Sequence, residues 1–319
     1  MRYFIIIFSI LAVLFLVALT ISLICFFMVF YSSRYLRRAK EEYPTPEGEI
    51  YDPYREQMVT WIKEIRAMPY TKVSITSYDG LKLCGKYYEQ KKGAPIEIMF
   101  HGYKGTAERD LCGGVFRAFA LGRNALIVDH RASGESEGKV ITFGIKESRD
   151  CLKWVNYVIE EIDPNAKIIL TGISMGAATV MTAASMDLPD NVVGILADCG
   201  YTSAKDIIKK VIRDMKLPAT LLYPFVRISA KIFGRFDPDE VSPIASMKKC
   251  SLPIIFIHGD TDDFVPCSMS EENYNACNSP YKRFLIIPEA GHGLCFPKDQ
   301  EAYFDALKSF FDPILIESQ

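Results

Sequence analysis

Apolar and polar residues form two kinds of pattern along this chain. Short apolar runs bounded by Gly, Pro, Asn or Asp indicate β-strands, whereas apolar residues recurring every three or four positions indicate helices. Beyond residue 51 the two patterns alternate, which predicts a mostly parallel sheet covered by helices on both faces. The eight predicted strands are Lys72 to Ser77, Lys82 to Tyr88, Ile96 to His101, Ala125 to Asp129, Lys167 to Thr171, Val192 to Ala197, Pro253 to His258 and Lys282 to Ile287.

The first two strands are expected to pair antiparallel. Tyr78-Asp79-Gly80 lies between them, and Asp-Gly is a strong signal for a tight hairpin turn. The stretch from Tyr51 to Ala67 has the pattern of an amphipathic helix. Residues 51–319 are therefore predicted to form one α/β domain, with a polar linker at 32–50 before it.

The N-terminal segment from Tyr3 to Tyr31 contains no charged residue. About 20 apolar residues cross a bilayer core, so residues 1–31 are predicted to form a transmembrane anchor. A cleavable signal peptide is the alternative, but its apolar region is shorter and ends in small residues. This segment stays bulky to its end, at Phe26-Phe27-Met28, which favours an uncleaved anchor.

The flanking charges predict the side of the membrane. Arg2 and the amino terminus precede the segment, whereas Arg34, Arg37, Arg38 and Lys40 follow it. Because positive flanks stay in the cytoplasm, the C-terminal domain is expected on the cytoplasmic side. The nine scattered cysteines agree with this, since their odd number and lack of a C-x-x-C pair do not suggest a disulfide framework.

Composition and charge exclude several classes of protein. The formal charge of −2 gives no basic field for nucleic acid. No G-x-x-x-x-G-K-[ST] loop or HExxH pair occurs, so nucleotide and zinc chemistry are not indicated.

One serine stands between two glycines where an apolar run ends, in the sequence Gly172-Ile-Ser-Met-Gly176. In G-x-S-x-G the serine occupies a sharp strand-to-helix turn that tolerates only small neighbours and lifts the hydroxyl clear of the sheet. Ser174 is thus a candidate nucleophile. The pattern alone also fits a serine that merely caps a helix after a strand.

A hydroxyl nucleophile needs a base and an acid that orients the base. His292 follows the last predicted strand in a glycine-flanked loop, where it can reach the carboxyl edge of the sheet. The loop after the seventh strand offers the carboxylates of Asp260, Asp262 and Asp263. The chain order Ser, Asp, His is the order of the α/β-hydrolases.

The motifs GISMG, HGDTDDFVP and EAGHG, in that order, resemble the catalytic motifs of α/β-hydrolase superfamily serine hydrolases. The likeness runs from about Val73 to Phe311. It implies that Asp262 is the acid of the triad, that Asp260 shapes the turn and that Asp263 faces solvent. Each motif lies at the C-terminal end of a predicted strand, and their joint spacing is far more specific than any one of them.

Two further stretches resemble elements of the family. His101 to Gly105 corresponds to the second half of an oxyanion hole, which implies backbone N–H donors at Tyr103 and Met175, with the His101 side chain structural. Asp129 to Gly138 departs from the family pattern, because Ala and Ser stand where Gly and His are usual. That loop is expected to shape the floor of the pocket, and its His130 to be structural.

A helical lid is expected at about 202–242, broken into short pieces at Leu217-Pro218 and Tyr223-Pro224. Its apolar face either lines an acyl-chain tunnel or packs on the domain beneath it. Between Lys205 and Arg235 eight Lys or Arg stand against two Asp. Such a patch either is a solvated face or attracts anionic headgroups or an anionic substrate.

The resemblance implies acyl transfer to water through an acyl-enzyme, with Ser174 as nucleophile and His292 as base, and without metal or organic cofactor. A serine nucleophile argues against a dehalogenase or epoxide hydrolase, and the segment before the domain is too short for the propeller of a prolyl oligopeptidase. The leading hypothesis is a membrane-anchored hydrolase of carboxylic esters of lipid-like substrates.

Two alternatives stay open. A thioesterase or an aminopeptidase-like amidase uses the same triad, and a non-catalytic scaffold with the same fold belongs to a different class. Against the scaffold weighs the presence of Ser174, Asp262 and His292 together. The expected partners are a small acyl substrate and the lipid bilayer; nucleic acid is not expected, and no protein partner can be predicted.

Overall fold

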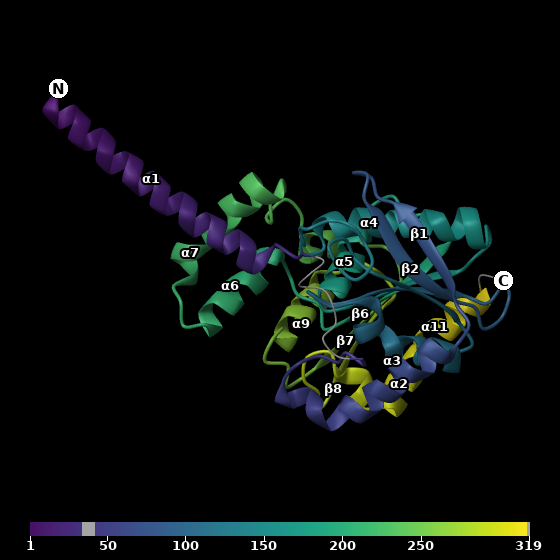
Figure 1. Ribbon diagram of the computed structural model, residues 1–319. Coiled ribbons are helices and arrows are strands. Elements are labelled where there is room, and N and C mark those ends of the chain that lie inside the picture. The colour runs from purple at the N-terminus through teal and green to yellow at the C-terminus, as the bar shows by residue number, and fades with distance from the viewer. Residues whose placement is uncertain (34–41, 318–319) are drawn as a thin grey trace.

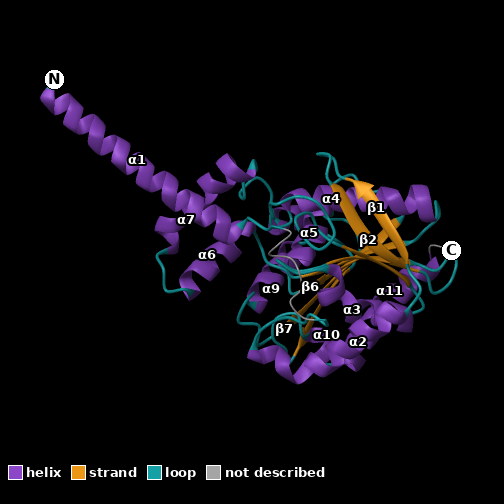
Figure 2. Ribbon diagram, viewed as in Figure 1, coloured by secondary structure: helices purple, strands orange, loops and turns teal. Residues whose placement is uncertain are grey.

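A computed structural model describes residues 1–33 and 42–317. Its centre is one eight-stranded sheet in the order β1-β2-β4-β3-β5-β6-β7-β8, with helices on both faces (Figures 1 and 2). The predicted fold class is thereby confirmed. The strands are β1 (Thr71–Thr76), β2 (Lys82–Tyr88), β3 (Ile96–Phe100), β4 (Asn124–Val128), β5 (Ile168–Ile173), β6 (Val192–Asp198), β7 (Ile254–Gly259) and β8 (Lys282–Ile287).

The pairing of the strands brings distant loops to one edge. β2 is antiparallel to both β1 and β4, and β1 and β2 form the predicted hairpin. From β4 to β8 all neighbours run parallel. Parallel strands end at the same edge, so the segments that follow β3, β5, β6, β7 and β8 lie together there.

Apolar side chains of the strands alternate between two cores. One face packs on helices that carry Trp154, Val180 and Met247, and the other on helices that carry Trp61, Val115 and Leu307. The first group comprises α4 (Ile145–Tyr157), η2 (Val158–Ile162), α5 (Met175–Ala183), α8 (Pro243–Met247) and α9 (Cys267–Ala276). The second comprises η1 (Glu49–Tyr54), α2 (Arg55–Ala67), α3 (Ala107–Ala120), α10 (Cys295–Lys298) and α11 (Gln300–Glu317).

The N-terminal helix α1 (Arg2–Val29) projects away from the sheet, and the lid helices flank its C-terminal half (Figure 1). It is 28 residues long and apolar enough to cross a membrane. Of the predicted linker at 32–50, residues 34–41 lie outside the described part of the chain. The start of the linker is bonded to the domain. The Ser32 amide donates to Lys139 O at 2.9 Å, and Tyr31, the residue before the linker, forms a bridge with Val140.

The lid region contains α6 (Ala204–Asp214), α7 (Ala219–Ser229) and η3 (Ala230–Gly234). The predicted break at Leu217-Pro218 separates α6 from α7, but the predicted break at Tyr223-Pro224 is wrong, because α7 runs through Pro224. Pro224 stands in the second turn of α7, where its ring removes only one backbone hydrogen bond. Packing of α7 along α1 offsets that loss.

Candidate active site

Ser174 occupies the sharp turn between β5 and α5. Its φ of +56° is a strained backbone conformation for a residue with a side chain, and it holds the hydroxyl at the edge of the sheet. The flanking glycines are sterically required: a Cβ on Gly172 would collide with the backbone of Gly176, and one on Gly176 would collide with the carbonyl of Phe100.

His292 links the serine to a carboxylate. Its Nε2 lies 2.9 Å from Ser174 Oγ, and its Nδ1 lies 2.7 Å from Asp262 Oδ2. Since a carboxylate only accepts, Nδ1 carries the proton and Nε2 accepts from the serine hydroxyl. The three side chains come from the loops after β5, β7 and β8, as expected from the sequence. This arrangement can activate a hydroxyl for attack on a carbonyl.

Asp262 is fixed by four hydrogen bonds and is almost fully buried. Its Oδ1 accepts from the amides of Phe264 and Val265 at 2.9 and 2.8 Å, and its Oδ2 faces His258 and His292. Burial alone would raise the pKa of Asp262, but the hydrogen bonds and electrostatic interactions with His258 and His292 hold that pKa below its usual value. The carboxylate therefore stays ionised at neutral pH.

The neighbouring aspartates have other roles. Asp260 accepts from the amide of Glu289 at 2.6 Å and so ties the loop after β7 to the loop that carries His292. Asp263 is exposed, and its backbone carbonyl accepts from Lys210 of the lid.

His258 contributes to the site, and the sequence did not predict this. It is fully buried at the end of β7, with Nε2 2.8 Å from Val265 O and 3.2 Å from Asp262 Oδ2. Its Nδ1 lies 2.6 Å from Ser270 Oγ. His258 thus fixes the loop that carries Asp262. A sequence signal exists only in hindsight, as a histidine four residues before the carboxylate.

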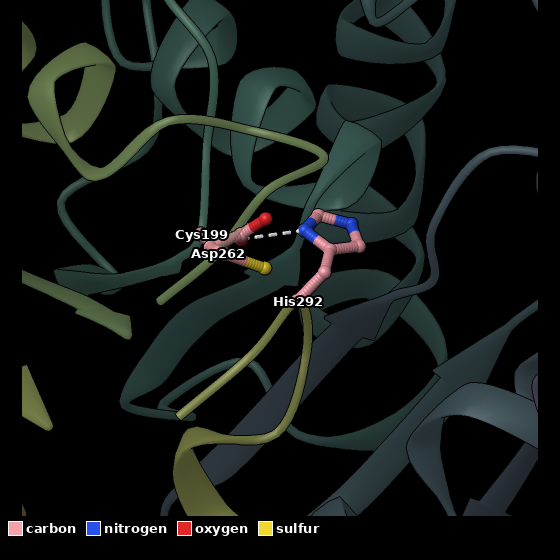
Figure 3. Close-up of side chains that lie close together, drawn as sticks. All are labelled: Cys199, Asp262 and His292. Carbon is pink, nitrogen blue, oxygen red and sulfur yellow. Dashed lines mark hydrogen bonds and ion pairs between the residues drawn. The ribbon is translucent and has the colours of Figure 1, made fainter. Parts of the chain in front are cut away.

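Cys199 lies behind the triad. Its Sγ, a carboxylate oxygen of Asp262 and a ring nitrogen of His292 lie within 4.8 Å of one another, and Figure 3 shows the His292 ring turned with its second nitrogen away from this cluster. Burial raises the pKa of the Cys199 thiol well above its usual value, so the thiol stays protonated. A protonated thiol and an imidazole already bonded to a carboxylate are a poor set of metal ligands.

The loop His101 to Gly105 passes close to Ser174. A Cβ on Gly102 would lie 3.6 Å from Ser174 Cβ. The Gly102 amide donates to Asp110 Oδ2 at 3.1 Å and is therefore already occupied. The amides of Tyr103 and of Met175, at the start of α5, stay the predicted oxyanion donors.

Two buried histidines brace this loop. His101 Nδ1 bonds Gly102 O at 2.7 Å, and its Nε2 accepts from the His130 amide at 3.0 Å. Burial lowers the pKa of His101 to about 4 and that of His130 to about 3, so both rings are neutral at pH 7. Both rings bond to loop backbone.

A cavity of about 530 Å³ opens beside Ser174 and His292 and extends between the sheet and the helices α2, α3 and α10. Residues 46–51, which the sequence assigned largely to a linker, form part of its wall. Its apolar lining includes Met58, Trp61, Met99, Leu111, Ile173 and Phe296.

One of the two alternatives for the lid, the acyl-chain tunnel, and the expectation that the loop 129–138 forms the pocket floor do not match this cavity. Among the described residues that line it, none comes from the lid at 202–242 or from the loop 129–138. The apolar face of the lid instead packs on Phe26, Phe143 and Met175. The loop 129–138 is occupied elsewhere: Arg131 forms ion pairs with Asp79 and Asp150, beside the β1–β2 hairpin.

Fold, strand order and sequence together define an α/β-hydrolase superfamily serine hydrolase. More specifically, the chain belongs to the prolyl oligopeptidase family, whose model matches residues 142–317. That segment contains Ser174, Asp262 and His292.

The chain is also similar to individual proteins. The Bacillus subtilis protein YqkD is 31% identical over 193 residues, which are 60% of this chain and 63%, less than two thirds, of that protein. Protein bem46 of Schizosaccharomyces pombe is 25% identical over 286 residues, covering 88% of this chain and 83% of the relative. The Pyrococcus furiosus esterase Pf2001 superposes with a TM-score of 0.64 at 23% identity, over 78% of this chain and 93% of that chain, and shows the same fold.

Proposed function

We propose that this protein is a membrane-anchored serine hydrolase that cleaves carboxylic esters of lipid-like or other amphiphilic substrates. The observation that carries the proposal is the continuous hydrogen-bonded path from Ser174 through His292 to Asp262 beside a largely apolar cavity. His292 takes the proton of Ser174 as the hydroxyl attacks the carbonyl. The Tyr103 and Met175 amides then stabilise the oxyanion, and water releases the acyl group with His292 again as base.

The shape of the cavity supports an acyl substrate. Its volume lies in the range of small-molecule sites, and Met58, Trp61 and Phe296 give it an apolar wall next to the nucleophile. A thioester fits the same wall and the same chemistry. The cavity is also lined by charged residues, among them Glu49, Arg109 and Asp263, and these can pair the backbone groups of a peptide, so an amide substrate stays an alternative.

A panel of p-nitrophenyl esters of increasing chain length, acyl thioesters and aminoacyl anilides tests the choice of leaving group. We expect the highest kcat/KM for esters and a rise with chain length up to the limit of the cavity, because longer chains bury more apolar surface against its wall. Anilides should be the poorest. Faster turnover of thioesters than of matched esters would move the assignment to a thioesterase, and turnover of anilides alone to an amidase.

The anchor is proposed to remain on the mature protein. Phe26 and Phe30 of the α1 region are 7% and 0% exposed, because they are buried against the lid and Phe143. Removing α1 as a signal peptide would strip this contact and expose an apolar surface on the lid.

We further propose that α7 lies near the bilayer. Residues 1–17 are exposed throughout, and the stretch from residue 2 to residue 17 is about 24 Å long at 1.5 Å per residue. A hydrocarbon core is about 30 Å thick, so the membrane also reaches the part of α1 that packs on α7. Three of the exposed apolar side chains of the lid are proposed to enter the bilayer surface: Leu221 and Ile228, seven residues apart on one face of α7, and Ile232 in η3.

Quenching by brominated lipids tests this geometry in the full chain reconstituted in vesicles. Val13→Trp should be strongly quenched, because it lies within the span, and Ile228→Trp should be quenched by lipids brominated near the headgroup. Ile286→Trp on β8, also exposed but remote from α1, is the matched control and should not be quenched. An unquenched Trp at 13 would remove the anchor, whereas an unquenched Trp at 228 alone would remove only the lid contact.

The cytoplasmic side is proposed from the basic flank at 34–40. The basic patch of the lid is partly neutralised: Lys210 pairs with Asp214, and Arg227 and Lys231 pair with Asp237. Its attraction for anionic headgroups is therefore weaker than the number of cations in the sequence indicates.

A further inference from the structure

The C-terminal end of α1 meets the loop beside the nucleophile. The last carbonyls of a helix lack amide donors from the next turn. Here the Ser32 amide, four residues after Met28, donates instead to Lys139 O. Lys104 Nζ donates to Met28 O at 3.0 Å, and Tyr103 OH donates to Val29 O at 2.6 Å. The ammonium group also complements the negative end of the helix dipole.

The same loop is held from its inner side. The Gly102 amide donates to Asp110, and His101 bonds the Gly102 carbonyl. Lys104 has a φ of +52°, a conformation that persists only where the surroundings enforce it. The Tyr103 amide therefore lies between Gly102, which is bonded within the domain, and the side chains of Tyr103 and Lys104, which are bonded to the end of α1.

Packing makes the end of α1 and this loop one unit. The Tyr103 ring lies 5.1 Å from the ring of Phe143, which lies 5.8 Å from that of Phe30. The Ile141 amide donates to Phe30 O at 2.8 Å. A shift of the last turn of α1 would therefore carry the Tyr103 side chain with it.

We propose that the last turn of α1 positions the Tyr103 amide for the oxyanion, which makes the anchor helix a working part of the active site. This rests on the proposed hydrolase function and adds a positioning role for the Tyr103 hydroxyl, which does not touch the substrate. Oxyanion donors act only within a narrow distance range, so a small displacement of this loop weakens stabilisation of the transition state while substrate binding is retained.

Tyr103→Phe in the full-length protein tests the proposal, because it removes the bond to Val29 O and keeps the ring and the amide. We expect kcat to fall about 10-fold with KM changed less than about twofold, since removing a whole donor costs 100-fold or more. The affinity of a trifluoromethyl ketone, which forms a tetrahedral oxyanion adduct with the serine, should fall by the same factor.

Tyr201→Phe is the matched control. Tyr201 is also buried in this apolar cluster and donates one hydrogen bond to a backbone carbonyl, Phe143 O at 3.1 Å. It should lose similar thermal stability while kcat and ketone affinity stay within about twofold of the wild type. Tyr103→Phe with kcat and ketone affinity like those of Tyr201→Phe would overturn the proposal.

Lys104→Met provides a second, independent measurement if Tyr103→Phe does not fold. It removes the bond to Met28 O from an exposed side chain and should lower kcat more than it changes KM, by a smaller factor than Tyr103→Phe. If Tyr103→Phe is not folded and Lys104→Met behaves as wild type, the positioning role is excluded. A wild-type protein without hydrolase activity would instead refute the proposed function, so the two failures are distinct.

Discussion

Replacing Ser174 with alanine is expected to lower kcat/KM for the best ester substrate by about 10 000-fold or more. Among the described residues that line the cavity, Ser174 alone joins a hydroxyl to an imidazole and a carboxylate. The buried Ser270 also bonds a histidine, His258, but neither of them lines the cavity. Alanine has a Cβ like serine, so the turn at φ +56° should survive the change. The measurement is steady-state hydrolysis together with covalent labelling by a fluorophosphonate, which should disappear in the variant.

Ser148→Ala is the control for this prediction. Ser148 is fully buried and donates to Ile145 O at 2.7 Å, so the variant also loses a buried hydroxyl, but in α4 and away from the triad. It should keep wild-type labelling and turnover. If Ser174→Ala retained more than about 1% of the wild-type kcat/KM, a serine nucleophile at this position would be untenable.

The centre of the sheet could be predicted from the sequence because β3 to β7 are buried on both faces and read as continuous apolar runs. The partly exposed strands β1, β2 and β8 were recognisable as short apolar runs bounded by turn residues. Lys82 to Tyr88 and Lys282 to Ile287 coincide with β2 and β8, and the other strands differ by one or two residues at their ends. β5 extends two residues beyond the prediction, to Ile173. Pairing of Gly172 and Ile173 with β6 continues the ladder there, which local pattern does not reveal.

The site was predictable where chemistry is encoded in short motifs and unpredictable where it depends on tertiary contacts. The GISMG turn and the loops of Asp262 and His292 carry glycines and carboxylates at recognisable places. His258 acquires its role only because the chain folds back over it. The cavity lies on the α2 and α3 side of the sheet, and its location depends on helix packing that the lid pattern could not indicate.

The ion pairs of Glu97 in the core also depend on tertiary contacts and could not be predicted from the sequence. It stands in the apolar run Ile96-Glu-Ile-Met-Phe100, where the sequence offers no neighbouring cation. In the fold it is fully buried, with Oε1 2.6 Å from Arg123 Nη1 and Oε2 2.6 Å from Arg117 Nη2. Burial alone would raise the pKa of Glu97, but the two guanidinium groups hold it below its usual value. One carboxylate thus forms ion pairs with two buried arginines.

Glu97→Gln is expected to destabilise the protein by about 3 to 5 kcal/mol, because it leaves two buried guanidinium groups without a counter-charge. The measurement is the free energy of unfolding from urea titration in detergent. Since the pKa of Glu97 is lowered on folding, its contribution is complete above the unfolded pKa of 4.5 and disappears as pH falls through the folded value. The difference between wild type and variant should therefore be constant at neutral pH and shrink in strong acid.

Arg123→Met tests whether the destabilisation by Glu97→Gln comes from the loss of the negative charge or would follow from any substitution in this cluster. Among the described residues, Arg123 Nε and Nη2 have no hydrogen-bond partner, so this side chain is already poorly satisfied. Its removal leaves Glu97 paired with Arg117 and replaces a buried cation by an apolar chain next to Phe311. The loss should be well below that of Glu97→Gln. Equal losses in both variants would mean that packing volume, and not the single negative charge, determines the stability of this part of the core.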